Sequence, residues 1–268
     1  MQNDLLKLDE ICSGVTKLTK EVRLFILNER KAFKTTSIEI KGHNDLVSYV
    51  DKKAEEMIVT GLMPLVREAG FITEENTTTI SGERYNWIID PLDGTTNFIH
   101  GMPNFCISIA LMEKDELILG VVHELNFDEC FYAWKDGGAF MNDKSIHVSE
   151  IKKLSDSLLA TGFPYYDYGR MAEYMQVFDH FMRNTHGLRR LGSAAADLAY
   201  VACGRFEAFY EYGLNAWDVA AGALIVKEAG GIVTDFSGGK DFVFGKELIA
   251  SNSLVNEEMY GVIKSYFN

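Results

Sequence analysis

The chain has 268 residues, of which 47% are hydrophobic and 24% charged, and its formal net charge at pH 7 is −13. This composition supports a sizeable hydrophobic core, and the acidic balance argues against nucleic acid as a ligand because phosphate backbones are bound by basic faces. The opening segment MQNDLLKLDE lacks the features of a signal peptide, and no apolar run reaches the length of a membrane span. We therefore expect a cytoplasmic protein that does not bind membranes.

The first part of the chain predicts two helices and two strands. Apolar residues recur every three or four positions over residues 8–25, which predicts an amphipathic helix. A second helix is expected over about residues 46–68, followed by short strands at 71–73 and 85–90. The second of these strands ends abruptly in an acid, Asp90.

The rest of the chain divides into two patterns. Short apolar runs separated by turn residues extend over 105–148, which is typical of an antiparallel meander. Strands and helices alternate beyond about residue 155, which favours a second α/β half. We predict a mixed α/β fold of two parts: an α+β half over residues 1–154 with most of the acidic candidates, and an α/β half over residues 155–268 that completes the site.

The string WIIDPLDGTTNF at residues 87–98 is the most informative stretch of the sequence. A buried strand delivers Asp90, and Asp93 returns to the same point after a tight turn. Gly94 permits an unusual backbone conformation, and Thr95 is a good residue for the start of a short helix. Two carboxylates and several free N–H groups would then face one spot. Carboxylate oxygens suit Mg²⁺, and N–H groups at a helix start can hold phosphate.

A second acidic segment lies far away in the sequence. The run NAWDVAAGALIVKEAGG over residues 215–231 places Asp218 at the start of a helix rich in small residues. An aspartate in this position is commonly an N-cap, and an isolated Asp-x-x-Asp-Gly is commonly a solvated turn. The residue types alone therefore leave both the structural and the metal-binding interpretations open.

Both segments match signatures of the inositol monophosphatase family over their whole length. One signature is a tryptophan-containing strand leading into Asp-Pro-x-Asp-Gly-Thr-Thr-Asn-Phe, and the other is Trp-Asp-x-Ala-Ala-Gly followed by Glu-Ala-Gly-Gly. Residues 45–51 (DLVSYVD) and 71–75 (FITEE) are similar to family segments that carry acids near the metals. The resemblance extends from about residue 40 to 235. It implies the layered αβαβα sandwich of the inositol monophosphatase and fructose-1,6-bisphosphatase type, usually as a homodimer.

The resemblance also implies which residues bind metal, with about two or three Mg²⁺ ions per site. The first metal would be held by Glu74, Asp90 and the Leu92 carbonyl. The second would be held by Asp90, Asp93 and Asp218, and a weaker third would involve Glu74. Residue chemistry does not distinguish Glu74 from Glu75, and only the alignment of the preceding Phe-Ile selects Glu74.

Catalytic and substrate-binding roles follow from the same resemblance. The implied catalytic residues are Glu74, Thr95, Asp45 and Asp51. Among them Thr95, hydrogen-bonded toward Asp45 or Asp51, would orient and help deprotonate the attacking water. The implied substrate contacts are Asp93, Gly94, Thr95, Ala194, Glu211 and Asp218.

The implied reaction is the Mg²⁺-dependent, lithium-sensitive hydrolysis of a small phosphorylated polyol or sugar, with inositol 1-phosphate as the first candidate. Alternative substrates are fructose 1,6-bisphosphate, histidinol phosphate, NADP and 3′-phosphoadenosine 5′-phosphate. Another alternative is a regulatory binding protein with residual phosphatase activity. The Thr-Thr-Asn-Phe ending disfavours the nucleotide branch, and the intact acids disfavour a purely regulatory role.

The sequence does not decide the roles of several residues near the motifs. Asn215 and Ala216 stand where animal members carry histidine and cysteine, so the sequence leaves the physiological substrate open. It also leaves open the roles of His43, His100, Arg189 and Arg190, which can equally be structural. The run Tyr165-Tyr166-Asp167-Tyr168 follows a segment that lies at the substrate mouth in the family, and is either a packed loop or a lid.

Overall fold

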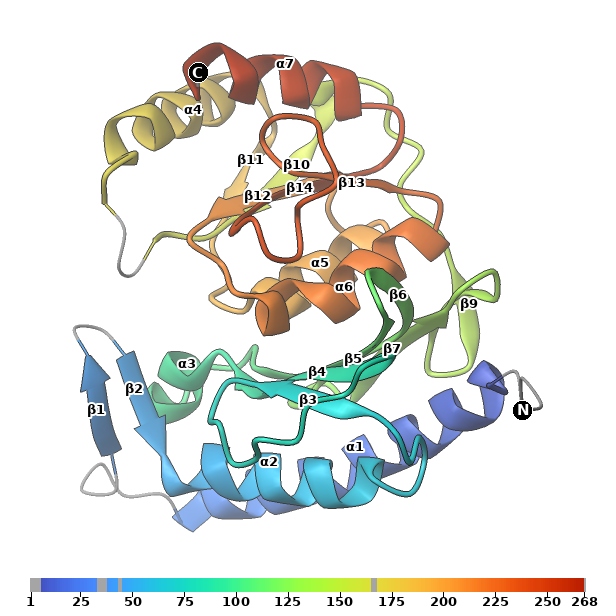
Figure 1. Ribbon diagram of the computed structural model, residues 1–268. Coiled ribbons are helices and arrows are strands. Elements are labelled where there is room, and N and C mark those ends of the chain that lie inside the picture. The colour runs from blue at the N-terminus through green and yellow to red at the C-terminus, as the bar shows by residue number, and fades with distance from the viewer. Residues whose placement is uncertain (1–5, 33–37, 43–44, 165–167, 268) are drawn as a thin grey trace.

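Five alternating layers of helices and sheets build the protein (Figure 1). The structure is a computed structural model that describes residues 6–32, 38–42, 45–164 and 168–267, with the backbone alone at 38–42 and 45–48. Three hydrophobic clusters lie between successive layers. The layered αβαβα sandwich expected from the sequence is confirmed.

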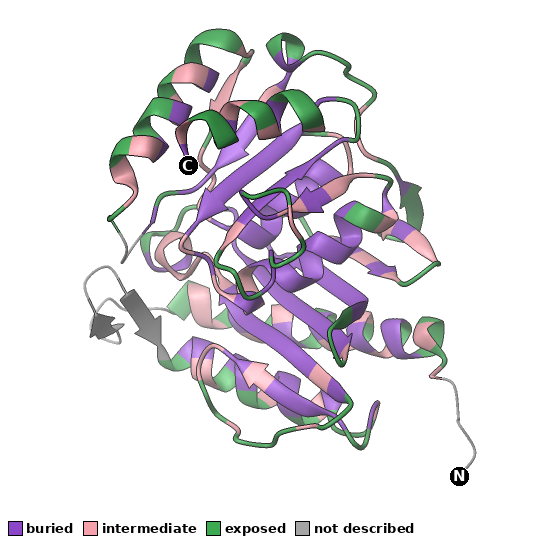
Figure 2. Cartoon of the chain, turned by 45° about the horizontal axis from the view of Figure 1, so that its top comes forward, coloured by how far each residue is buried: buried purple, intermediate pink, exposed green. Residues whose placement is uncertain are grey.

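The first layer consists of the helices α1 (Leu8–Ala32) and α2 (Tyr49–Leu62). Each buries one face against the neighbouring sheet, as the apolar spacing predicts (Figure 2). The expected start and end of the second helix are wrong. It begins only at Tyr49, because residues 45–48 form a strand, and it ends at Leu62, since Pro64 disfavours a helical conformation at the preceding residue.

Two short strands precede α2. β1 (Ile38–Gly42) and β2 (Asp45–Ser48) pair antiparallel and form a separate two-stranded sheet. Asp45 is therefore the first residue of β2, and its side chain lies outside the described part of the structure.

The second layer is a seven-stranded sheet whose strands are hydrogen-bonded in chain order. Its strands are β3 (Gly70–Thr73), β4 (Tyr85–Asp93), β5 (Cys106–Glu113), β6 (Glu116–Glu124), β7 (Glu129–Trp134), β8 (Gly138–Met141) and β9 (Lys144–Ile146). β3 is parallel to β4, and all other neighbours are antiparallel. This confirms the antiparallel meander predicted over residues 105–148.

The third layer, α5 (Ala194–Ala202) and α6 (Ala216–Glu228), is enclosed between the two large sheets (Figure 1). Its small residues allow the backbones of the helices and strands to approach one another. At Gly120 of β6, for example, an added Cβ would lie only 2.6 Å from the carbonyl oxygen of Ala221 in α6. This close approach places the first turn of α6 against the end of β4 and the start of β5, where Ser108 Oγ donates a hydrogen bond to the Trp217 carbonyl at 2.9 Å.

The last two layers come from the carboxyl-terminal part of the chain. The fourth is a mixed sheet in the order β11-β10-β12-β14-β13. Its strands are β10 (Leu158–Thr161), β11 (Gly187–Arg189), β12 (Ala208–Tyr212), β13 (Ile232–Thr234) and β14 (Glu247–Ser251). The helices α4 (Met171–Asn184) and α7 (Asn256–Tyr266) cover its outer face, and the short 3₁₀ helix η2 (Leu154–Asp156) precedes it.

The division of the chain into residues 1–154 and 155–268 stays a prediction. The seven-stranded sheet comes from residues 70–146 and the five-stranded sheet from residues 158–251. In the described part of the chain, every helix is too short or too polar to cross a bilayer.

Candidate active site

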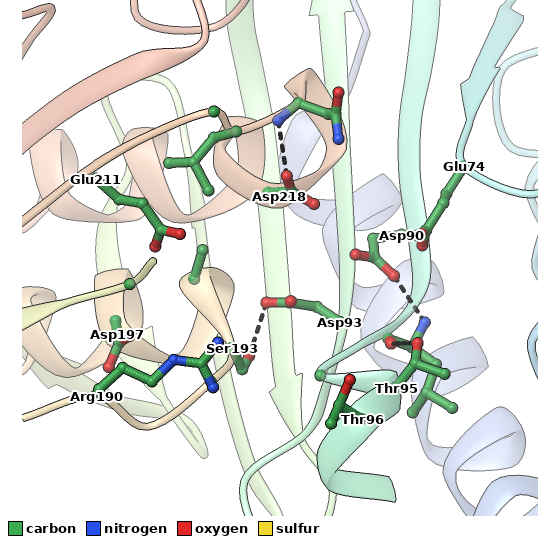
Figure 3. Close-up of a pocket in the computed structure, with 18 residues that line it drawn as sticks. Glu74, Asp90, Asp93, Thr95, Thr96, Arg190, Ser193, Asp197, Glu211 and Asp218 are labelled. Carbon is green, nitrogen blue, oxygen red and sulfur yellow. Dashed lines mark hydrogen bonds between the residues drawn. The ribbon is translucent and has the colours of Figure 1, made fainter. Parts of the chain in front are cut away.

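A pocket of about 140 Å³ opens between the two large sheets, where β4 ends and the helices α3 (Thr95–His100), α5 and α6 begin (Figure 3). The first turns of three helices, where backbone N–H groups lack intrahelical acceptors, therefore meet at this pocket. Residues of both sheets line the pocket, including Glu74 after β3 and Glu211 on β12. The site thus depends on the packing of the layers against each other.

The turn after β4 brings two carboxylates together as the sequence predicts. β4 pairs irregularly with β5 between Asp90 and Asp93. Asp90 is buried, and its Oδ1 accepts a hydrogen bond from the Leu92 N–H at 2.8 Å. Gly94 has a φ of 94°, and an added Cβ would lie 3.1 Å from the carbonyl oxygen of Asn104. Glycine is required here because the backbone is left-handed and the space is closed.

Asp93 joins β4 to the start of α5. Its Oδ2 accepts hydrogen bonds at 2.7 Å from both Ser193 Oγ and the Ala195 N–H. Ser193 is the N-cap of α5, so the cap and the carboxylate hold each other in place.

Asp218 lies in the first turn of α6. Its Oδ2 accepts a hydrogen bond from the Asn215 N–H at 2.7 Å, which is a helix-capping interaction. It also belongs to a cluster. One carboxylate oxygen from each of Asp90, Asp93 and Asp218 lies within 4.8 Å of the others, and we call these three residues the carboxylate cluster. The capping and the metal-binding interpretations of Asp218 are therefore compatible.

Glu74 lies beside the carboxylate cluster. It follows β3, lines the pocket and approaches Asp90 (Figure 3). The backbone N–H of its neighbour Glu75 instead donates to Glu55 Oε2 at 2.8 Å on α2. Of the two adjacent glutamates, Glu74 is the one that lines the pocket.

Burial raises the pKa of every one of these four carboxyl groups, and the charges of neighbouring carboxylates add to the rise at Glu74, Asp90 and Asp218. Burial, with a contribution from the charge of Asp93, raises the pKa of Asp218 to about 7. Burial raises the pKa of Asp93 to about 6, although hydrogen bonds from Ser193 and Ala195 oppose the rise. The pKa values of Asp90 and Glu74 are well above their usual range, first because of burial and then because of nearby carboxylates.

The residues present fit a divalent cation. The donors are buried oxygens that crowd together, and such groups ionise readily only when a cation compensates their charge. An all-oxygen set suits a hard ion such as Mg²⁺. The Leu92 carbonyl oxygen lies in the same turn, 3.0 Å from Thr95 Oγ1.

Thr95 is the first residue of α3 and lies close to an acid from α2. Its Oγ1 is 3.0 Å from Asp51 Oδ1 and also 3.0 Å from the Leu92 carbonyl oxygen. Asp51 is buried in the first turn of α2. The sequence left open whether Asp45 or Asp51 approaches Thr95, and within the described side chains Asp51 does so.

The opposite end of the pocket holds the remaining expected substrate contacts, together with two residues without an expected role. Ala194 starts α5, and Glu211 projects from β12 into the pocket. Arg190 and Asp197 also line this end (Figure 3). Sequence reasoning missed Asp197, although an acid within the apolar run AAADLAY is a recognisable signal. The adjacent Arg189 is exposed and donates to the carbonyl of Leu188 at 3.0 Å.

Other candidate residues lie away from the pocket or outside the described part of the structure. His100 is exposed at the end of α3. His43 and residues 165–167 lie outside the described residues, so the lid interpretation stays a prediction; Tyr168 is exposed.

The αβαβα fold and a pocket that joins clustered carboxylates to three helix starts fit a metal-dependent phosphatase. The model of the inositol monophosphatase family matches residues 7–266, and the chain belongs to this family. The family resemblance found in the sequence is thereby confirmed.

Known relatives agree with this assignment. The inositol-1-monophosphatase of Mesorhizobium japonicum is 41% identical over 229 residues, which cover 85% of this chain and 86% of that protein. The fructose-1,6-bisphosphatase/inositol-1-monophosphatase of Thermotoga maritima is 43% identical over 223 residues, covering 83% and 84%. The crystal structure of the extragenic suppressor protein suhB from Bartonella henselae has a TM-score of 0.89 at 38% identity, and the match covers 94% of this chain and 97% of that one.

Proposed function

We propose that the protein hydrolyses a small phosphomonoester with the help of Mg²⁺, and that inositol 1-phosphate is its first candidate substrate. The observation that carries the proposal is the carboxylate cluster, whose oxygens lie within 4.8 Å of one another beside three helix starts. The names of the relatives in Mesorhizobium and Thermotoga support the same substrate. Nucleic acid is an unfavourable ligand for a chain with a formal charge of −13.

The proposed metal ligands form two overlapping sets. Glu74, Asp90 and the Leu92 carbonyl would hold one ion. Asp90, Asp93 and Asp218 would hold another, and a weaker third would involve Glu74. Bound divalent ions neutralise phosphoryl oxygens, make water a better nucleophile and stabilise a leaving alkoxide. The fit rests on the crowding of buried oxygens, since their charges repel unless cations lie among them.

The remaining steps fall to groups of the chain itself. The N–H groups of Gly94 and Thr95, at the start of α3, would hold phosphate oxygens. The Thr95 hydroxyl is within hydrogen-bond distance of the Asp51 carboxylate, so it can pass its proton toward Asp51 and accept one from the attacking water. Asp45 remains a proposed second acid near this hydroxyl.

The leaving group would lie at the opposite end of the pocket. There Ala194 and Glu211 line the wall beside Asp93 and Asp218 (Figure 3). A buried carboxylate accepts hydrogen bonds from hydroxyl groups, and Glu211 is only 7% exposed. This arrangement favours a polyol or a sugar as the alcohol that is released.

A phosphate-release assay tests the proposal. The purified protein is given a panel of phosphomonoesters with Mg²⁺ or with EDTA: inositol 1-phosphate, glycerol 2-phosphate, fructose 1,6-bisphosphate, histidinol phosphate, NADP and 3′-phosphoadenosine 5′-phosphate. We expect Mg²⁺-dependent release that is fastest with a polyol or sugar ester. Release that is unaffected by EDTA, or confined to the nucleotides, would contradict the proposal. Fructose 1,6-bisphosphatase activity is the second candidate, because the name of the Thermotoga relative includes it.

A homodimeric state and a cytoplasmic location also belong to the proposal, on the strength of the family resemblance. Light scattering coupled to size-exclusion chromatography tests the first against a monomer mass of 30.1 kDa. Cell fractionation tests the second.

A further inference from the structure

One end of the pocket contains two carboxyl groups and one guanidinium group. Arg190, Asp197 and Glu211 lie together there, across the pocket from Glu74 and Asp90 (Figure 3). Asp197, in the first turn of α5, is 1% exposed, and Glu211 is 7% exposed. Among the described residues that line the pocket, Arg190 is the one with a cationic side chain. We call these three residues the acid–arginine group.

Packing holds the members of the acid–arginine group in place. The guanidinium carbon of Arg190 lies 5.5 Å from the centre of the Phe163 ring, a cation–π contact at the rim of the pocket. The Glu211 carboxylate lies against Gly162, where an added Cβ would meet Glu211 Oε2 at 1.9 Å. Any side chain at position 162 would therefore displace this carboxylate.

Asp197 has a hydrogen-bonding capacity that the described residues do not use. None of them donates a hydrogen bond to its buried Oδ1. A buried polar atom without a partner destabilises the fold, so such atoms commonly face a ligand or water. Since Asp197 lines the pocket, a substrate hydroxyl that reaches this end would supply the missing donor.

The charges at this end balance without a ligand. Burial raises the pKa values of Asp197 and Glu211 well above the usual range, and the charge of Arg190 opposes both rises. The guanidinium carries one positive charge, and the two acids together can offset or outweigh it. An incoming second phosphate would therefore meet a neutral or negative surface, although the pocket contains an arginine.

We propose that Asp197 is a specificity-determining residue: by compensating Arg190 and accepting a hydrogen bond from a hydroxyl group, it makes this end select esters of uncharged polyols over bisphosphates. The inference rests on the proposed phosphatase function and narrows its substrate class. Like charges placed together at a binding surface oppose binding, so removal of the Asp197 charge should change the discrimination between the two esters measurably.

The test compares kcat/KM for inositol 1-phosphate and for fructose 1,6-bisphosphate in wild type and in Asp197→Asn. We expect wild type to favour the monophosphate, and Asp197→Asn to shift the ratio toward the bisphosphate by about tenfold, which equals ~1.4 kcal/mol. Asp115→Asn, in an exposed turn between β5 and β6, removes the same charge from the surface and should leave the ratio unchanged. An unaltered ratio in Asp197→Asn, or an equal loss for both esters, overturns the inference.

Arg190→Gln provides an independent test, which also serves if thermal unfolding shows that Asp197→Asn does not fold. Without the guanidinium, two carboxyl groups remain uncompensated, and the ratio should move against the bisphosphate; an unchanged ratio overturns the inference. The outcomes separate the two proposals. If wild type releases phosphate from no ester of the panel, the proposed function fails and the inference with it; if it hydrolyses other esters of the panel but neither of these two, the inference alone fails. If both esters are hydrolysed and the Asp197→Asn ratio matches wild type, only the inference fails.

Discussion

Thr95 and Asp51 connect two helices that belong to different parts of the fold. The Thr95 hydroxyl at the start of α3 lies 3.0 Å from Asp51 Oδ1 in the first turn of α2. The same hydroxyl is 3.0 Å from the Leu92 carbonyl oxygen, so two acceptors compete for one proton. When that proton is directed toward Asp51, the lone pairs of the oxygen are free to accept a hydrogen bond from water.

Loss of this hydroxyl should slow the chemical step. General acid–base groups contribute roughly 10²–10⁴-fold, so we expect kcat of Thr95→Ala to fall by about 100-fold or more with little change in KM. Thr60→Ala removes a hydroxyl from the exposed face of α2, where it bonds only the Glu56 carbonyl, and serves as the matched control. If Thr95→Ala keeps wild-type kcat, Thr95 does not take part in activating the water.

Asp90 is the most sensitive position of the proposed metal site, because it belongs to both ligand sets. Asp90→Asn should lower kcat/KM by about 10³-fold, since each factor of ten corresponds to roughly 1.4 kcal/mol and a metal contributes several. The metal-free variant should unfold at the same or a higher temperature than wild type, because a buried, repelling charge is gone. Retention of more than about a tenth of the wild-type rate at saturating Mg²⁺ would refute the assignment.

The raised pKa values predict how stability depends on pH and metal. The pKa of Asp93 is about 6 and that of Asp218 about 7 in the folded protein, above the ordinary value of 3.8. Ionisation therefore costs the folded state more than the unfolded state. Protonation of the two carboxyl groups therefore stabilises the folded state. In EDTA this stabilisation is lost progressively as pH rises from about 4, and it is fully lost above pH 7.

Thermal unfolding measures this effect. In EDTA we expect Tm to fall by several degrees between about pH 5.5 and about pH 8, and Mg²⁺ to raise Tm more at the higher pH, where protons no longer compete for the carboxylates. Asp218→Asn should weaken both dependences, which separates the site from the general repulsion of an acidic protein. A Tm that is equally sensitive to pH in this variant would exclude Asp218 as a cause.

The local sequence was sufficient to predict the part of the site that a single continuous segment forms. The turn from Asp90 to Thr95 follows from a buried strand, a proline and a glycine with positive φ, all of which are contiguous. The approach of Asp218 depends on the packing of α6 against Gly120, which lies about a hundred residues earlier in the chain. No local pattern specifies that contact, and the family resemblance supplied it.

Two misses have identifiable causes. Residues 46–48 belong to a strand although the sequence predicts a helix from about residue 46, because their apolar residues also fit helical spacing with those of α2. Asp197 lies in a helix that is apolar on all sides, so nothing in its periodicity points toward a pocket. Its neighbours Arg190 and Glu211 come from different elements and meet it only in the folded protein.

Lithium should inhibit the enzyme if the second metal position is organised as proposed. Asp90, Asp93 and Asp218 are close enough to share one ion. The family resemblance implies that lithium takes this position after hydrolysis, so LiCl should lower the rate of phosphate release far more than NaCl at equal concentration. Equal responses to both salts would indicate a differently arranged second site.

We expect Asn215, which precedes α6, to contact the substrate and to influence which substrates are accepted. It lines the pocket as the residue before the helix, and its N–H donates to Asp218 Oδ2 at 2.7 Å. The asparagine side chain can donate and accept but carries no charge, whereas a histidine titrates near neutral pH. We therefore expect wild type to accept several polyol and sugar phosphates. A neutral hydrogen bond contributes about 0.5–1.5 kcal/mol, so Asn215→His should alter substrate ratios by roughly tenfold or less.

The measurement is kcat/KM for several phosphomonoesters in wild type and Asn215→His across the neutral pH range. The variant keeps the backbone N–H that donates to Asp218 Oδ2, and the Mg²⁺ concentration for half-maximal rate is the control for an effect on the metal site. A histidine that reads the substrate would make the ratios depend on pH near its ordinary pKa of about 6.5, while the ratios of wild type stay level. If all esters change by one common factor, position 215 acts on the metal site or on stability. If wild type hydrolyses a single ester of the panel, the expected breadth is wrong whatever the variant does.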